Sequence, residues 1–270
     1  MYILTNFLYQ LVFTVGIVAV FGLLIALARR LFVGLLGGAG AKTLLVTGFV
    51  GTPIHELSHA LMCLVFFHKV EEIKLYTPNS DDGTLGYVNH SYNPKNIYHQ
   101  IGNFFIGIAP ILGGTAVLML LMSLLAPDVH TAVSAEISAT GLSRSLTSAS
   151  TYTNYLGLIW SIIGLIFSTS NFSSVLWWVF IVLAIMIASH MELSGADIVG
   201  SLKGLGILAV ILLIADAIVG LISKSALNSL TSFMTSGALY MLAFLGISFI
   251  FCLVMVVVAL VLHIVFKRIL

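Results

Sequence analysis

The sequence has few charged residues. Lys, Arg, Asp and Glu make up 8% of the 270 residues, whereas 60% are hydrophobic, and the mean hydropathy is +1.13. This composition is typical of an integral membrane protein and excludes an ordinary soluble domain. The net charge is +1 and no basic block occurs, so the lipid bilayer is an expected partner and nucleic acid is not.

Cysteine is also scarce. Cys63 and Cys252 both fall in apolar stretches, where they are expected to act as small hydrophobic residues and not as a disulfide framework. The N-terminus lacks the basic segment of a signal peptide, and the apolar residues 7–28 contain no small-residue cleavage site. We therefore expect this first stretch to remain as a membrane helix.

Long apolar stretches predict an all-α polytopic membrane protein with about six transmembrane helices. The expected spans are residues 7–28, 44–67, 104–126, 175–189, 205–222 and 237–266. Residues 155–167 are apolar but too short to cross the hydrocarbon core, which favours an interfacial or re-entrant helix. In this division residues 1–43 form an N-terminal helix with a Gly-rich link, residues 44–201 a central core, and residues 202–270 two C-terminal helices.

The segment after the second span is polar and rich in turn-forming residues. Short apolar runs on either side of residues 77–83, which end in Asp82-Gly83, predict a small β-hairpin over about residues 70–92. Three histidines of this region, His68, His90 and His99, share no metal-ligand spacing and are expected at the surface or at an interface.

The second span contains the sequence His55-Glu56-Leu57-Ser58-His59. On a helix this spacing places both imidazoles on one face, where they can bind one Zn²⁺. Glu56 could then accept a proton from a zinc-bound water, whose pKa the metal lowers from about 15.7 to about 7. These polar residues could instead join membrane helices. Ionisable groups at bilayer depth each cost at least about 2.5 kcal/mol, however, and this cost favours a metal site.

Two imidazoles leave a catalytic zinc one protein ligand short. His190, Glu192 and Asp197 are candidates that cluster in one later stretch. His190 and Asp197 are seven residues apart and would share a helix face, so spacing does not decide between them, whereas Glu192 would project in another direction. Two isolated residues, Asp216 and His263, are expected to serve helix packing or to lie at an interface.

The third span contains Ala109-Pro110-Ile111-Leu112-Gly113. The small residues Ala109 and Gly113 would allow another backbone to approach closely, and Pro110 leaves a backbone carbonyl without its helical donor. The partner could be the helix that carries the two histidines or a different helix.

Together these features resemble the site-2 protease family of intramembrane zinc metalloproteases. The resemblance covers about residues 44–201 and rests on the motif at 55–59, the hairpin, the stretch at 109–113, and an Asp that follows small residues. It implies one Zn²⁺ bound by His55, His59 and Asp197, with Glu56 as the general base. The chain departs from the family pattern at Ala109, where the family has Gly before Pro.

The remaining site assignments combine the residue pattern with this resemblance. His190 is expected to orient a ligand or to stabilise the transition state, and Glu192 is the alternative metal ligand. The hairpin is expected to present the substrate as an extended strand, through Ile73, Leu75, Gly86, Tyr87 and Val88.

The expected function is that of an intramembrane zinc endopeptidase that cleaves transmembrane proteins or peptides, located in the plasma membrane of a prokaryote. A metal transporter or sensor would explain the metal ligands but not the position of Glu56. A noncatalytic relative that binds membrane clients would explain the hairpin but not an intact motif.

Overall fold

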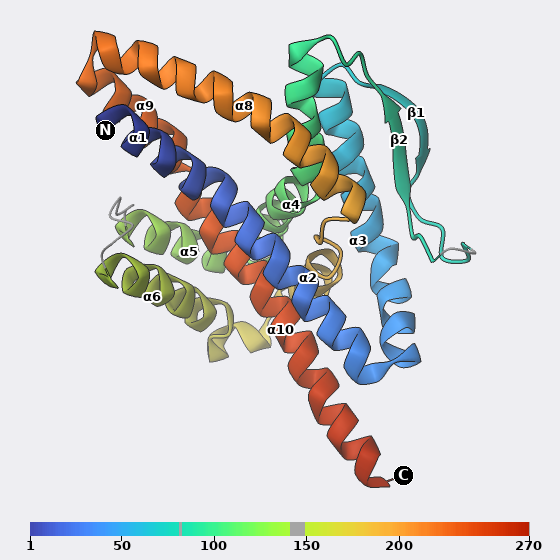
Figure 1. Cartoon of the computed structure of the whole chain (residues 1–270). Coiled ribbons are helices and arrows are strands. Elements are labelled where there is room, and N and C mark those ends of the chain that lie inside the picture. Colours follow the sequence, from blue (N-terminus) through green and yellow to red (C-terminus); the bar gives the residue numbers. More distant parts are fainter. Residues whose placement is uncertain (81–82, 141–148, 270) are drawn as a thin grey trace. The chain divides into compact units, whose positions relative to one another are not determined.

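The computed structural model describes residues 1–80, 83–140 and 149–269, and it is built mainly of helices (Figure 1). The helices are α1 (Tyr2–Leu11), a π-helical turn (Val12–Gly16), α2 (Ile17–Leu36), α3 (Gly38–Val65), α4 (Ile97–Leu125), α5 (Pro127–Thr140), α6 (Ala149–Ile166), a 3-10 turn (Thr169–Ser173), α7 (Val175–Ala188), α8 (Gly195–Ile222), α9 (Lys224–Ser236) and α10 (Ala238–Ile269). The strands are β1 (Lys69–Lys74) and β2 (Tyr87–Ser91).

Within the described part of the chain, five helical segments are long and apolar enough to cross a membrane. They are Tyr2–Leu36, Ile97–Leu125, Thr153–Ser173, Gly195–Ile222 and Lys224–Val265. The mainly helical class is therefore confirmed, and the five long apolar helices are compatible with a multi-pass membrane protein, while the set of spans differs from the expected six.

Two expected spans do not meet these criteria, although both are helical. Helix α3 has 28 residues, but the polar motif lies within it and lowers its mean hydropathy. Helix α7 has 14 residues, about 21 Å, which is less than the roughly 30 Å hydrocarbon core. The expectation that 155–167 is too short to cross does not match the structure, in which α6 and the 3-10 turn after it form the segment Thr153–Ser173, long and apolar enough to cross.

The predicted hairpin is present and forms a two-stranded antiparallel sheet. Its strands pair Lys69 with Ser91 at the base and Lys74 with Tyr87 toward the turn, with an irregularity between Val70 and Glu72. The expected Asp82-Gly83 turn falls partly on residues 81–82, which lie outside the described residues. Next to this turn the Thr77 N–H donates to the Leu85 carbonyl at 2.6 Å and joins the two sides of the hairpin.

The chain divides into two compact units made of interleaved segments. The first contains Met1–Val20, Met119–Phe180 and Gly206–Ile247. In this unit the Tyr2 hydroxyl donates to the Lys224 carbonyl at 2.5 Å, and the indole of the buried Trp177 donates to the Ile166 carbonyl at 2.9 Å.

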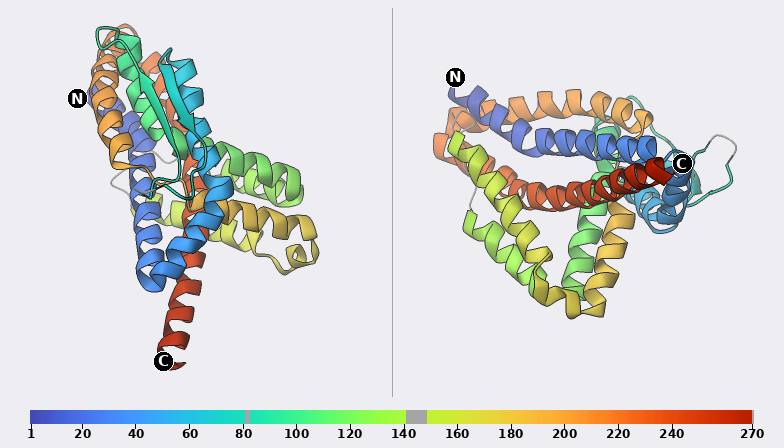
Figure 2. Two further views of the ribbon diagram at one scale, coloured as in Figure 1. Left: turned by 90° about the vertical axis from the view of Figure 1, so that its right-hand side faces the viewer. Right: turned by 90° about the horizontal axis from the view of Figure 1, so that it is seen from below.

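The second unit contains Phe21–Leu118, Ile181–Leu205 and Ser248–Leu270, and it holds every residue of the expected catalytic site. Part of its core is a cluster of Phe32, Leu44, Met255 and Ala259. Figure 2 shows the hairpin alongside α3 in this unit.

Candidate metal centre

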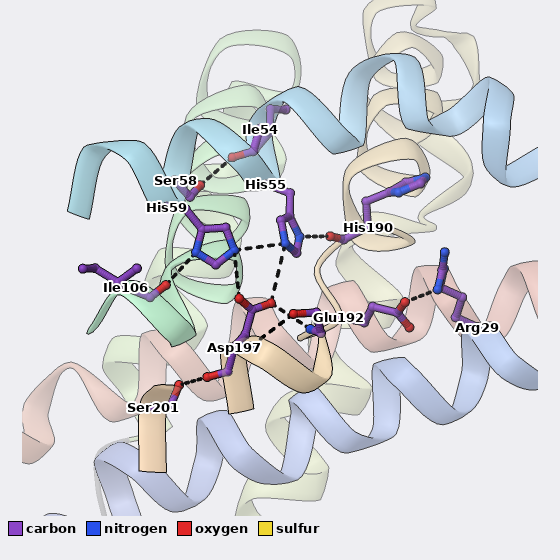
Figure 3. A network of polar contacts seen from close by, with 11 residues as sticks. Arg29, Ile54, His55, Ser58, His59, Ile106, His190, Glu192, Asp197 and Ser201 are labelled. Carbon is purple, nitrogen blue, oxygen red and sulfur yellow. Dashed lines mark hydrogen bonds and ion pairs between the residues drawn. The ribbon is translucent and has the colours of Figure 1, made fainter. Parts of the chain in front are cut away.

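Helix α3 brings the two histidines of the motif together. His55 Nε2 and His59 Nε2 are 3.2 Å apart, on neighbouring turns of the helix (Figure 3). His59 is buried and His55 is partly exposed. The i, i+4 spacing is thus sufficient to place both ring nitrogens at one point, as the sequence predicts.

Backbone carbonyls determine which nitrogen of each ring carries the proton. The Nδ1 atom of His55 lies 2.8 Å from the His190 carbonyl oxygen, and the Nδ1 atom of His59 lies 2.7 Å from the Ile106 carbonyl oxygen. A carbonyl oxygen only accepts, so each Nδ1 must donate its proton. In the neutral rings both Nε2 atoms therefore direct lone pairs at the same point, which is the arrangement of metal-ligating histidines.

Pro110 makes the Ile106 carbonyl available. In a regular helix the N–H of residue 110 would donate to the carbonyl of residue 106, but proline has no N–H. His59 donates to this carbonyl instead. The freed carbonyl expected from the sequence thus has its partner on the helix that carries the motif.

Glycines on α4 allow the close approach that this hydrogen bond requires. A Cβ atom at Gly113 would lie 1.9 Å from Ser58 Oγ, and one at Gly107 would lie 2.4 Å from the Asp197 carbonyl oxygen. Helix α4 therefore packs against α3 through Gly113 and against α8 through Gly107.

Asp197 lies in the first turn of α8, and its carboxylate is held by the start of that helix. The Ser194 N–H donates to Asp197 Oδ2 at 2.8 Å, and the Asp197 N–H donates to Ser194 Oγ at 3.1 Å. These reciprocal bonds form a capping box in which Asp stands in the place of Glu. Asp197 Oδ1 is 3.3 Å from His59 Nε2, and Oδ2 is 4.0 Å from His55 Nε2.

The three side chains fit a metal ion. One ligand atom from each of His55, His59 and Asp197 lies within 4.8 Å of the other two. Two imidazole lone pairs and a carboxylate would repel one another if nothing positive stood between them. Two nitrogens and one oxygen are a donor set of catalytic zinc sites, which keep a fourth position open.

His190 and Glu192 are placed differently from the metal ligands. The ring of His190 turns toward α3, where its Nε2 is 3.0 Å from Thr47 Oγ1 and its Nδ1 is 3.4 Å from Thr52 Oγ1. His190 contacts the metal centre through its backbone carbonyl, which accepts from His55 Nδ1. The carboxylate of Glu192 is paired with the guanidinium of Arg29.

A family model described as "Putative zincin peptidase" matches residues 48–145. This match indicates a zinc-dependent peptidase, since zincins are the peptidases built on His-Glu-x-x-His. It includes the part of α3 that carries the motif, the hairpin and α4 but not Asp197, and it does not distinguish site-2 proteases from other zinc metallopeptidases. Comparisons with curated proteins and with solved structures gave no significant match.

A cavity of about 710 Å³ adjoins the centre. Glu56 lines it together with the two histidines and Asp197, and its side chain is 6% exposed. Gly86 lies against Glu56, because a Cβ atom at Gly86 would be 2.9 Å from Glu56 Cγ. The hairpin therefore runs directly over the expected general base.

The two strands of the hairpin contribute unequally to this cavity. Of the expected substrate-binding residues, Gly86, Tyr87 and Val88 line it, whereas Ile73 and Leu75 are not among the lining residues. Sequence reasoning missed Arg29 and Lys203, two cations that also line the cavity. Arg29 directly follows the first expected span, 7–28, and only its pairing with Glu192 reveals its place near the site.

The three histidines near the hairpin form a cluster at its base. His68 is 4% exposed and stacks on Tyr92. Its Nε2 donates to the His99 carbonyl at 2.8 Å, which leaves its Nδ1 to accept from His90 Nδ1 at 3.1 Å. They lie at an interface between the hairpin and α4, one of the two locations expected from the sequence.

We expect Asp197→Asn to weaken zinc binding by at least about 10-fold, because it removes a negatively charged ligand and leaves the side-chain size unchanged. Metal analysis of the purified protein measures this effect. Glu192→Gln is the matched control and should retain zinc, because Arg29 holds that carboxylate. Full zinc occupancy in Asp197→Asn, with loss in Glu192→Gln, would identify Glu192 as the ligand instead.

Acidic pH should loosen the base of the hairpin. Burial lowers the pKa of both His68 and His90, so the closed base binds fewer protons than the open one. The stabilisation of the closed hairpin base by the neutral histidines is therefore fully present at neutral pH. It falls as the pH drops below about 6.5, the ordinary pKa of histidine. Hydrogen exchange of residues 69–91, corrected for the intrinsic pH dependence, should show this loss of protection.

A glutamine at position 90 provides the test variant. His90→Gln keeps an N–H donor for His68 and removes one titrating group, so it should reduce the pH dependence of exchange. His130→Gln, which lies outside this cluster on α5, should leave that dependence unchanged. Equal pH dependence in wild type and His90→Gln would show that the cluster does not control the hairpin base.

Proposed function

We propose that this protein is an intramembrane zinc-dependent endopeptidase that cleaves transmembrane proteins or peptides. The observation that carries the proposal is the convergence of His55 Nε2, His59 Nε2 and the Asp197 carboxylate at one point, with Glu56 in the same cavity. The zincin family match supports the peptidase chemistry. The apolar helices support a site within the membrane.

Each residue then has a separate task. His55, His59 and Asp197 would hold Zn²⁺, which when bound lowers the pKa of a water molecule and polarises the scissile carbonyl. Glu56 takes the proton of the attacking water on a carboxylate oxygen and gives it to the leaving amine nitrogen. The carbonyls of Ile106 and His190 keep the imidazoles in the ligating tautomer throughout.

Water must reach a site that lies among apolar helices. Polar side chains line the cavity beside the centre, including Arg29, Glu192 and Lys203. Polar and charged groups at membrane depth are tolerated where they face a water-filled cavity. We infer that this cavity supplies the water for hydrolysis and receives the scissile segment.

The hairpin is suited to hold that segment. A helical transmembrane substrate must unwind locally before its peptide bonds are accessible, and its freed N–H and C=O groups then need partners. Strand β2 lines the cavity along Tyr87, Val88, Asn89 and His90, so an extended substrate could add to β2 as a further strand. We propose β2, and not β1, as the strand that pairs with the substrate.

The proposed activity is tested with purified protein and a panel of single-span membrane proteins. Glu56→Gln should retain zinc and lower cleavage by roughly 10²–10⁴-fold, because it removes the general base and keeps the ligands. The matched control is Glu72→Gln on β1, whose carboxylate is exposed and should not affect cleavage. Undiminished cleavage by Glu56→Gln would refute this mechanism.

The same preparation separates the alternative functions. Metal flux into liposomes without any cleavage would indicate a transporter, and a purified protein that binds membrane clients but no metal would indicate a noncatalytic binder. Neither outcome is compatible with an endopeptidase.

Single prolines in β2 test the substrate strand. Neighbouring N–H groups of a strand point to opposite edges, so Val88→Pro and Asn89→Pro remove one donor facing β1 and one facing away from it. We expect the variant that keeps hydrogen-exchange protection in Lys69–Lys74 to lose cleavage and retain zinc. Wild-type cleavage by that variant would exclude strand addition at β2.

A further inference from the structure

Helix α8 contains one buried acid, Asp216, in the part of the helix that belongs to the first unit. Among residues 205–222 of this helix, Asp216 is the one fully buried residue, and its exposure is 0%. Its neighbours along the helix are exposed or partly exposed apolar residues. An ionisable residue in such a span is a candidate functional site, and its partners indicate its role.

Hydrogen bonds through Gln10 link Asp216 to two other helices of the same unit. Gln10 of α1 donates from Nε2 to Asp216 Oδ1 at 3.1 Å and to Thr231 Oγ1 of α9 at 2.9 Å. All three side chains are 0% exposed. Both N–H groups of the glutamine amide are thereby used.

Two oxygens of this cluster have no donor. They are Gln10 Oε1 and Asp216 Oδ2, which are buried and form no hydrogen bond with any described residue. Buried oxygens without partners are rare, and an ionised carboxylate with a single neutral donor is especially costly in an apolar setting. The cluster therefore lacks a positive charge or a proton.

No cation of the described residues pairs with the Asp216 carboxylate. Among the described residues no Lys, Arg or His lies within 4.0 Å of the Asp216 carboxylate. The titratable groups on the two helices that Gln10 and Thr231 belong to are Tyr2 and Tyr9 on α1 and Lys224 on α9. Lys224 is exposed, with its Nζ 5.9 Å from the centre of the Tyr2 ring.

We propose that Asp216 and Gln10 form a proton-binding site. The proton is bonded to Asp216 Oδ2, and this hydroxyl donates to Gln10 Oε1, while Gln10 Nε2 donates back to Asp216 Oδ1. A protonated carboxyl group is both donor and acceptor, so one proton satisfies both orphan oxygens and removes the charge. A metal ion fits less well, because hard cations such as Mg²⁺ and Ca²⁺ take six or more oxygen ligands.

The bound proton has a structural consequence. The paired acid and amide join α8 to α1, and the second N–H of Gln10 joins both to Thr231 of α9. Loss of the proton would leave a bare negative charge and two unsatisfied oxygens between these helices. The assembly of the three helices therefore depends on proton binding at Asp216.

Asp216→Asn tests the site in the full-length protein in detergent. Asparagine has the shape of the neutral acid and can donate to Gln10 Oε1, so its melting temperature should equal or exceed that of the wild type. Asp216→Leu, which removes both hydrogen-bonding groups, should lower it by several degrees. A melting temperature of Asp216→Asn as low as that of Asp216→Leu would overturn the proposal.

Infrared difference spectra identify the occupant directly. The wild-type spectrum minus the Asp216→Asn spectrum should contain the C=O stretch of a protonated carboxylic acid at neutral pH, and carboxylate bands in its place would overturn the proposal. Stabilisation by sodium chloride over choline chloride, present in wild type and lost in Asp216→Asn, would show a metal ion instead. Neither measurement depends on proteolysis, so both stand whether or not the proposed activity is found.

Discussion

The site depends on two hydrogen bonds that direct imidazole protons away from one point. His55 and His59 can hold a metal only if both Nε2 atoms are unprotonated, and this requires an acceptor for each Nδ1. The acceptors are backbone carbonyls at His190 and Ile106, which lie 135 and 47 residues from their donors. A large part of the second unit therefore serves to bring α4 and the loop after α7 up to one face of α3.

Glycines at the contact points allow these segments to approach α3. A Cβ atom at Gly51 would lie 2.3 Å from the Met186 carbonyl oxygen, and one at Gly113 would lie 1.9 Å from Ser58 Oγ. Pro110 has the complementary effect, because the donor that it lacks would otherwise occupy the Ile106 carbonyl. Helix packing and ligand orientation thus have common causes, and a change at any of these positions would move the imidazoles as well as the helices.

Several polar side chains around the metal centre have specific partners. Asp197 is held by the capping box of α8, Glu192 by Arg29, and the ring of His190 by Thr47 and Thr52. This agrees with the high cost of unpaired polar groups in an apolar medium. In the first unit the proposed proton on Asp216 meets the same requirement without any charged partner.

The sequence alone determined the long apolar helices, the hairpin and the two-histidine motif, because these follow from composition and from spacing within one segment. It also showed that Pro110 frees a carbonyl. Tertiary structure decided which helix uses that carbonyl, that Glu192 pairs with Arg29, and that β2 faces the cavity. Sequence spacing left His190 and Asp197 equivalent, and the fold separates them by turning the His190 ring toward two threonines and the Asp197 carboxylate toward the histidines. These pairings and orientations depend on which surfaces of distant segments pack together, and the periodicity within one segment carries no information about that packing.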